Sequence, residues 1–149
     1  MKIGQLASAS DTVVETIRYY EREGLLPEPA RTESNYRTYG GEHLARLQFI
    51  RYCRGLDMSL EEIRVLLRFK DSPQENCGDV NTVLDEHIGH VSRRIKELRA
   101  LEKELKALRA QCLETREAQQ CGILEGLARA SNTTKKPSGQ HLKGVHRAA

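Results

Sequence analysis

The chain has 149 residues, of which 38% are hydrophobic, 5% aromatic and 30% charged. This composition excludes one large compact core and fits a small globular unit joined to an extended helix. The net charge of +3 is mild, and four of the 24 basic residues stand in residues 132–149, which hold no acidic residue. Binding of nucleic acid therefore has to be argued from where the charges lie.

We find no segment that would direct the chain to a membrane or out of the cell. The first residues, MKIGQLAS, lack the apolar run of a signal peptide, and no stretch reaches transmembrane length. We therefore expect a cytoplasmic protein with no membrane partner. In a reducing compartment, its four cysteines are more typical of metal ligands, reactive thiols or core residues than of disulfides.

The first two predicted helices are IGQLASAS and DTVVETIRYYEREG, joined by a tight polar turn. Thr12 and Glu15 have the spacing of a capping box at the start of the second helix, and Gly24 supplies the left-handed residue that ends it. We expect Val13 and Ile17 on its inner face. The pair forms a helix-turn-helix pattern, although many small helical domains look alike by composition.

The next segment narrows this interpretation. LLPEPARTESNYRTYG contains two prolines, which bar a helix, and then an Arg/Thr/Tyr-rich stretch broken at ESN, which suits a small hairpin, or wing. GEHLARLQFIRYCRGL and SLEEIRVLLRFK indicate two more amphipathic helices, and Ser59 and Glu62 repeat the capping-box spacing. We interpret Cys53, in the first of these helices, as a core residue.

A long helix over residues 79–112 gives the clearest periodic pattern. Its apolar residues follow spacings of three and four, a coiled-coil seam with one stammer; they are Leu84, Ile88, Val91, Ile95, Leu98, Leu101, Leu105, Leu108 and Cys112. A single helix cannot bury such a seam, so we expect a homodimer. The alternative is that the helix folds back on its own N-terminal domain, but that domain is small and the helix spans roughly 50 Å.

Three cysteines stand near the ends of this helix. Cys77 lies just before it, Cys112 closes it and Cys121 follows after LETREAQQ. Along a straight helix Cys77 and Cys112 of one chain are roughly 50 Å apart, so they cannot share a ligand. If the helices of a two-fold dimer run antiparallel, the partner subunit's Cys77 comes beside Cys112 and Cys121, and LETREAQQ is long enough to fold Cys121 back over Cys112.

Three thiolates would form a soft site, and soft ligands select soft ions. Structural zinc usually takes four ligands, so the set suits lead, mercury or cadmium better. Each cysteine also has a simpler interpretation: Cys112 as packing in the seam, Cys121 as an apolar residue of a short terminal helix, and Cys77 as a loop residue. A Cys112–Cys121 disulfide is the main chemical alternative.

Several stretches together resemble the MerR family of bacterial transcription regulators over residues 1 to about 128: KIGQLA, VETIRYYEREGLLPEPAR, NYRTYG, HLARLQFIRYCRGLDMSLEEIRVLL and LDEHIGHV. SPQENCGDVNTVLDEHI with the Cys112–Cys121 pair looks like the lead- and cadmium-responsive branch. The resemblance implies a mainly α fold, with a winged helix-turn-helix DNA-binding domain and a long antiparallel coiled-coil dimerisation helix.

The resemblance also implies partners and a mechanism. A homodimer would bind a palindrome in double-stranded promoter DNA, and metal binding would make the dimer bend and untwist that DNA. RNA polymerase would then use the promoter, so its link to the protein is indirect, through DNA. By motif position the DNA-facing residues would be Thr16, Arg18 and Tyr19 in the second helix and Asn35, Tyr36 and Arg37 in the wing.

These residue types suit their implied roles. Arg18 can read a guanine edge or clamp a phosphate. Tyr19 and Tyr36 offer hydroxyl donors to phosphate, which fix the register on DNA. Core packing is the alternative for Tyr19, and it is the interpretation we favour for Tyr20 on the apolar face.

The expected organisation has five parts: a winged helix-turn-helix domain (1–70), a linker (71–78), the coiled-coil helix (79–112), a metal-binding loop with a short terminal helix (113–128) and a disordered basic tail (129–149). The expected metal ligands are Cys77, Cys112 and Cys121, with Pb2+ or Cd2+ as the favoured ion and Hg2+ or Zn2+ as alternatives. His87 and His90 are a candidate weak second metal site, although exposed histidines on a polar helix are usually only solvated.

Three classes of function follow. The favoured one is a metal-responsive transcription regulator. The alternative is a thiol redox regulator on the same DNA-binding scaffold, which would use a reversible Cys112–Cys121 disulfide. An enzyme is not expected, because the sequence shows no Ser/His/Asp or Cys/His pairing with a credible pocket.

Overall fold

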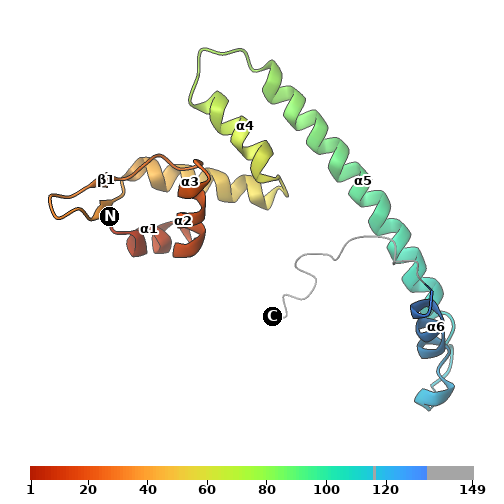
Figure 1. Ribbon diagram of the computed structural model, residues 1–149. Coiled ribbons are helices and arrows are strands. Elements are labelled where there is room, and N and C mark those ends of the chain that lie inside the picture. The colour runs from red at the N-terminus through yellow and green to blue at the C-terminus, as the bar shows by residue number, and fades with distance from the viewer. Residues whose placement is uncertain (116, 134–149) are drawn as a thin grey trace. The chain divides into compact units, whose positions relative to one another are not determined.

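The computed structural model describes residues 1–115 and 117–133 (Figure 1). The chain divides into two compact units, Met1–His87 and Ile88–Ala149, and each is described by itself. Residues 134–149 of the predicted disordered tail lie outside the described residues, whereas residues 129–131 are the last three of a helix.

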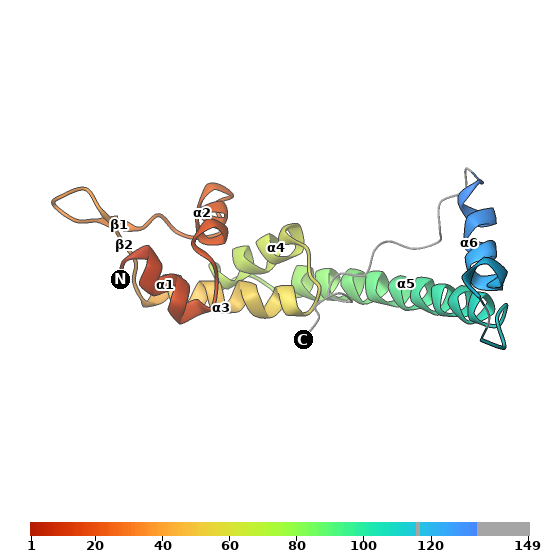
Figure 2. The ribbon, with the colours of Figure 1, turned by 90° about the horizontal axis from the view of Figure 1, so that it is seen from below.

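The first unit is helical around a small two-stranded hairpin. Its elements, in chain order, are α1 (Ile3–Ser10), α2 (Val14–Arg22), β1 (Ala30–Arg31), β2 (Arg37–Thr38), α3 (Gly41–Gly55), α4 (Leu60–Lys70) and the beginning of α5 (Gly78–Arg109). Figures 1 and 2 show the hairpin projecting from the helices of this unit. The mainly α fold with a helix-turn-helix and a wing is therefore confirmed.

The start of α2 differs from the prediction. Thr12 does not cap the helix; its hydroxyl donates instead to the carbonyl oxygen of Ser10, at 3.0 Å. The N-cap is Val13, which has no side chain able to accept a hydrogen bond and is 68% exposed. The capping box and the inward position of Val13 were therefore wrong, because the turn after α1 uses the Thr12 hydroxyl and the N-cap moves one residue along, to Val13.

The end of α2 agrees with the sequence. Gly24 has φ +71°, the left-handed conformation that glycine adopts without a steric penalty. The segment from Gly24 to Gly40 contains no helix, as its two prolines require.

The wing is a short antiparallel hairpin in which Ala30 pairs with Thr38 and Arg31 with Arg37. Its turn closes through Thr32, whose backbone N–H donates to the carbonyl oxygen of Tyr36 at 2.8 Å. Asn35 takes a left-handed φ of 65°, which asparagine tolerates better than most residues. The break that the sequence placed at ESN is this turn.

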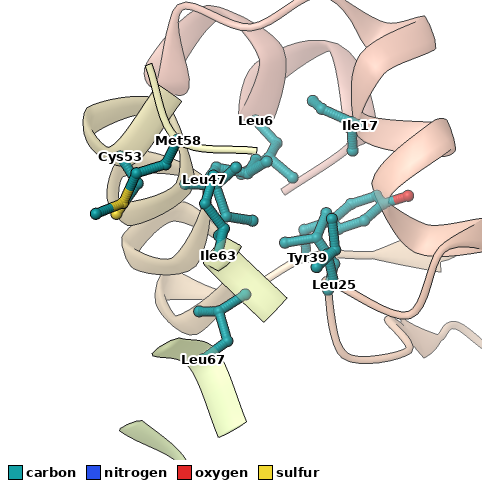
Figure 3. Packing of buried hydrophobic residues seen from close by; sticks show 11 residues of the cluster. Leu6, Ile17, Leu25, Tyr39, Leu47, Cys53, Met58, Ile63 and Leu67 are labelled. Atoms are coloured by element: carbon teal, nitrogen blue, oxygen red, sulfur yellow. The ribbon is translucent and has the colours of Figure 1, made fainter. Parts of the chain in front are cut away.

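The core of the first unit joins α1, α2, α3, α4 and the segment between α2 and the wing (Figure 3). It consists of Leu6, Ile17, Leu25, Leu26, Tyr39, Leu47, Ile50, Cys53, Met58, Ile63 and Leu67. The core assignment of Cys53 is confirmed, and burial raises the pKa of its thiol. Tyr20 packs partly buried against this cluster, as its place on the apolar face predicts.

Helix α4 begins with the predicted capping box. The backbone N–H of Glu62 donates to the Ser59 hydroxyl at 3.1 Å, and the backbone N–H of Ser59 donates to the Glu62 carboxylate at 3.0 Å. Two of the orphan amides at a helix start are satisfied in this way.

The second unit contains the rest of α5, a short 3-10 helix, η1 (Ala118–Gln120), and α6 (Gly122–Ser131). Figures 1 and 2 show α6 beside the C-terminal end of α5. Helix α5 ends at Arg109, so Cys112 lies just beyond the helix instead of closing it. Among the described residues, no helix is long and apolar enough to cross a membrane.

Candidate DNA interface and metal centre

Helix α2 presents its predicted DNA-facing residues beside a buried anchor. Ile17 is fully buried, and its neighbour Arg18 is exposed. Tyr19 is 40% exposed, and its ring lies 6.1 Å from that of Tyr20 and 6.0 Å from the Arg22 guanidinium. Core packing is therefore excluded for Tyr19, whereas Thr16 is only half-exposed.

The wing residues are more open. Tyr36 is 73% exposed, and Arg31 donates to the carbonyl oxygen of Asn35 at 3.1 Å, which braces the turn. The Arg37 side chain is 46% exposed. An exposed aromatic ring and a basic side chain on a braced turn are groups that can contact phosphates.

A groove of about 770 Å³ brings helix and wing residues together within the first unit. Its wall includes four of the six predicted residues, Arg18, Asn35, Tyr36 and Arg37, but not Thr16 or Tyr19. Lys2 and Arg31 add two cations, and no acidic residue lines the groove. A basic, acid-free groove is the electrostatic footprint of a polyanion site.

Glu21 is a residue that the sequence reasoning missed. From α2 its carboxylate accepts a hydrogen bond from the Tyr39 hydroxyl and pairs with Arg37 of the wing at 3.4 Å. Burial, together with the Glu21 carboxylate, raises the pKa of Tyr39 to about 12. Glu21 thus ties the wing to α2, and no local sequence pattern reveals a contact between residues 18 positions apart.

Cys112 and Cys121 come together in the second unit. All four cysteines are free thiols. The Cys112 thiol donates to the carbonyl oxygen of Glu114 at 3.1 Å, and Cys121 occupies the N-cap position of α6. The backbone N–H of Leu124 lowers the pKa of the Cys121 thiol, and the Ile123 N–H and the neighbouring Cys112 side chain act in the same direction. Helix N-termini stabilise thiolates in this way.

Cys77 lies at the other end of α5. It is exposed and directly precedes the helix, where its carbonyl oxygen accepts a hydrogen bond from the backbone N–H of Asn81 at 3.1 Å. The donor set of three thiols, two of them adjacent and one thiolate-stabilised, suits a soft metal ion. The meeting of Cys77 with the other two cysteines stays a prediction.

The environment of His87 was not expected from the sequence. The residue is only 7% exposed, its Nε2 lies 2.8 Å from the Leu56 carbonyl oxygen, and its Nδ1 lies 3.0 Å from the Glu62 carboxylate. His90 follows one turn later on α5 and is exposed. The second metal site at His87 and His90 stays a prediction.

Comparison with known proteins identifies the family. A protein-family model described as MerR HTH family regulatory protein matches residues 1–70. A second family model, described as MerR, DNA binding, matches residues 44–108. The HTH-type transcriptional regulator ZntR homolog of Haemophilus influenzae is 51% identical over 109 residues, which cover 73% of this chain and 81% of that protein. The chain belongs to the MerR family.

Other MerR relatives cover more of the chain. The mercuric resistance operon regulatory protein of Bacillus cereus is 39% identical over 126 residues, 85% of this chain and 96% of that protein. The crystal structure of the transcription regulator PbrR691 from Ralstonia metallidurans in complex with lead(II) shows 54% identity, covers 85% of this chain and 98% of that one, and has a TM-score of 0.74. Since these relatives are transcription regulators, the expectation that the chain is not an enzyme is confirmed.

Proposed function

We propose that this MerR protein is a cytoplasmic transcription regulator that senses a soft heavy metal. It binds a palindrome in promoter DNA as a homodimer and activates transcription when metal occupies a three-cysteine site shared by the two subunits. The observation that carries the proposal is the Cys112–Cys121 pair, in which Cys121 is the N-cap residue of α6 and has a lowered thiol pKa.

The third ligand comes from the partner subunit. The 32 residues of α5 stand between Cys77 and Cys112, and a helix of that length spans about 48 Å. An antiparallel partner helix brings the partner subunit's Cys77 to the Cys112–Cys121 pair, because a two-fold axis exchanges the helix ends.

The exposed seam of α5 supports the dimer. Ile88 is 57% exposed, Val91 39%, Ile95 43% and Leu105 57%. Apolar side chains at three- and four-residue spacing on a charged helix form the surface that coiled coils bury.

The relatives support a heavy metal as the inducer. One is described as a mercuric resistance regulator, and the structure of another contains lead(II). Three thiolates favour Pb2+ or Cd2+ here, with Hg2+ and Zn2+ as alternatives. Metal binding releases thiol protons, so affinity rises with pH until the thiols are ionised.

Activation acts through DNA. Bending a site substantially costs on the order of 1–6 kcal/mol. The dimer would have a resting and an activating conformation. A metal that binds the activating conformation more tightly shifts the population toward that conformation, and the difference in the two binding free energies sets the size of the shift. RNA polymerase then uses the distorted promoter without a required contact to the protein.

A metal titration tests the proposal. The reduced dimer is titrated with Pb(II), Cd(II), Hg(II) and Zn(II), and thiolate-to-metal absorption is followed in the wild type and in Cys77→Ser. We expect one tightly bound soft ion per subunit, lost in the variant. Cys53→Ala, which also removes one thiol but from the core, should keep that stoichiometry.

The same titration separates the redox alternative. If Cys77→Ser binds metal like the wild type, the three-thiolate site does not exist. A promoter response to peroxide without metal, unaffected by Cys77→Ser, would then assign the protein to thiol redox regulation through Cys112 and Cys121.

A further inference from the structure

Two glycines of α6 lie against the segment that follows α5. A β-carbon placed on Gly122 would stand 2.3 Å from the backbone carbonyl oxygen of Gln111. One placed on Gly126 would stand 2.3 Å from the Gln111 side-chain oxygen and 3.3 Å from a methyl group of Leu108. Because ordinary contacts of a β-carbon are about 3.5–4 Å, α6 can approach this closely only where both residues lack a side chain.

Backbone conformation does not explain these glycines. Gly24 is the glycine with a positive φ among the described residues, so Gly122 and Gly126 hold conformations open to any amino acid. Glycine is also a poor helix former, yet it stands at two positions of a ten-residue helix. Residues four apart share one face of a helix, so Gly122 and Gly126 both face Gln111. This close contact explains why glycine stands at the two positions.

The contact joins the two peptide segments that carry the thiols. Gln111 directly precedes Cys112, and Gly122 directly follows Cys121. The same position of α6 places Cys121, the N-cap residue of that helix, next to the segment that carries Cys112. A shift of α6 away from Gln111 would therefore move Cys121 from Cys112.

We propose that Gly122 and Gly126 are positioning residues of the metal site: by letting α6 rest on Gln111, they set the separation of Cys112 and Cys121 before metal arrives. This inference rests on the proposed function, because the geometry matters for metal binding only if these thiols are ligands. Neither glycine touches the metal itself.

The two glycines differ in a way that makes the inference testable. An alanine at position 122 meets a backbone oxygen, which cannot move aside without moving the chain next to Cys112. An alanine at position 126 meets mainly the end of a flexible side chain. Gln111→Ala removes that side chain and leaves the backbone oxygen in place, so it should relieve the second substitution and not the first.

The experiment measures Cd(II) affinity of the full-length dimer by competition, together with the intensity of the thiolate-to-metal band at saturation. We expect Gly122→Ala to weaken binding by about 10-fold or more, the range seen when groups that orient metal ligands are altered. Gly126→Ala should weaken Cd(II) binding less, and adding Gln111→Ala should restore its affinity. Adding Gln111→Ala to Gly122→Ala should leave Cd(II) affinity low. Gly89→Ala on α5, which meets open space, is the matched control.

A second readout separates this inference from the proposed function. The rate at which diamide, a two-electron thiol oxidant, converts Cys112 and Cys121 to a disulfide reports their proximity whether or not metal binds. We expect a slower rate in Gly122→Ala and an unchanged rate in Gly89→Ala, with equal helix content by circular dichroism. The inference would be overturned if Gly122→Ala formed the disulfide at the wild-type rate and bound Cd(II) with wild-type affinity. It would also be overturned if Gln111→Ala restored Cd(II) affinity equally in the Gly122→Ala and Gly126→Ala variants. Failure of the wild type to bind Cd(II), Pb(II) or Hg(II) would instead refute the proposed function.

Discussion

The two units of the molecule are stabilised differently. Among the described residues, all eleven buried hydrophobic ones lie between Leu6 and Leu67, in the first unit. No described residue of the second unit is buried, and the apolar side chains of its part of α5 are exposed or only half-buried. Since burial of apolar surface is the main source of folding free energy, the first unit has a core of its own, whereas the proposed dimer would supply the burial that the second unit lacks.

Disruption of the α5 seam should have the largest effect. Leu101→Asp places a charge in the seam, where a dimer would bury it without a partner, so we expect a monomer with no binding to palindromic DNA. Lys103→Asp, on an exposed face of the same helix, should remain a dimer. Sedimentation velocity measures both, and a dimeric Leu101→Asp protein would show that the second unit does not depend on this seam.

A core substitution tests the independence of the first unit. Ile17 is fully buried, so Ile17→Ala should lower the free energy of unfolding by about 2–5 kcal/mol. Val13→Ala, one turn earlier and exposed, should change it by less than about 0.5 kcal/mol. Urea unfolding followed by circular dichroism gives both values. Similar losses in the two variants would contradict the assignment of Ile17 to the core and Val13 to the surface.

The link between α2 and the wing should have a smaller effect. Glu21→Gln removes the negative charge that disfavours tyrosinate, so the pKa of Tyr39 should fall from about 12 toward its ordinary value. The fall should be partial, because burial is the larger cause and remains. The free energy of DNA binding should weaken by about 1 kcal/mol, because Arg37 of the wing loses its ion pair with Glu21.

Spectrophotometric titration measures this pKa. The chain has five tyrosines, so the Tyr39 contribution is the difference between each protein and its Tyr39→Phe counterpart. An unchanged Tyr39 pKa in Glu21→Gln would show that the carboxylate does not contact the hydroxyl.

The smallest effect concerns Cys121 alone. Its lowered pKa predicts that alkylation by iodoacetamide begins at a lower pH than for an ordinary cysteine. A variant with Cys77→Ser and Cys112→Ser leaves Cys121 as the accessible thiol, since Cys53 is buried. The backbone amides of Leu124 and Ile123 should keep most of the shift there. An ordinary alkylation profile would show that the start of α6 does not stabilise the thiolate.

Local sequence patterns predicted much of the first unit. Ser59 and Glu62 form the expected capping box, and Gly24 ends α2, because each pattern needs only residues a few positions apart. The prediction failed at Thr12, where the hydroxyl had a second acceptor, the carbonyl oxygen of Ser10. Residue spacing alone cannot decide whether the Thr12 hydroxyl caps α2 or donates to the Ser10 carbonyl oxygen.

The candidate site shows the same limit. The Cys112–Cys121 proximity followed from loop length, but the position of Cys121 at the start of α6 did not. The Glu21 contact with the wing and the His87 contact with Glu62 join residues far apart in sequence, and each depends on how helices pack. Sequence reasoning therefore gave the residue types of the site but not their supporting contacts.

A mixed-dimer experiment tests the shared site most directly. Subunits carrying Cys77→Ser are combined with subunits carrying both Cys112→Ser and Cys121→Ser, and the tagged heterodimer is purified and titrated with Cd(II). If the site takes Cys77 from the partner, each homodimer lacks every complete site and the heterodimer regains one, so one tightly bound ion per heterodimer is predicted. A heterodimer that binds no more tightly than the two homodimers would contradict the shared three-thiolate site.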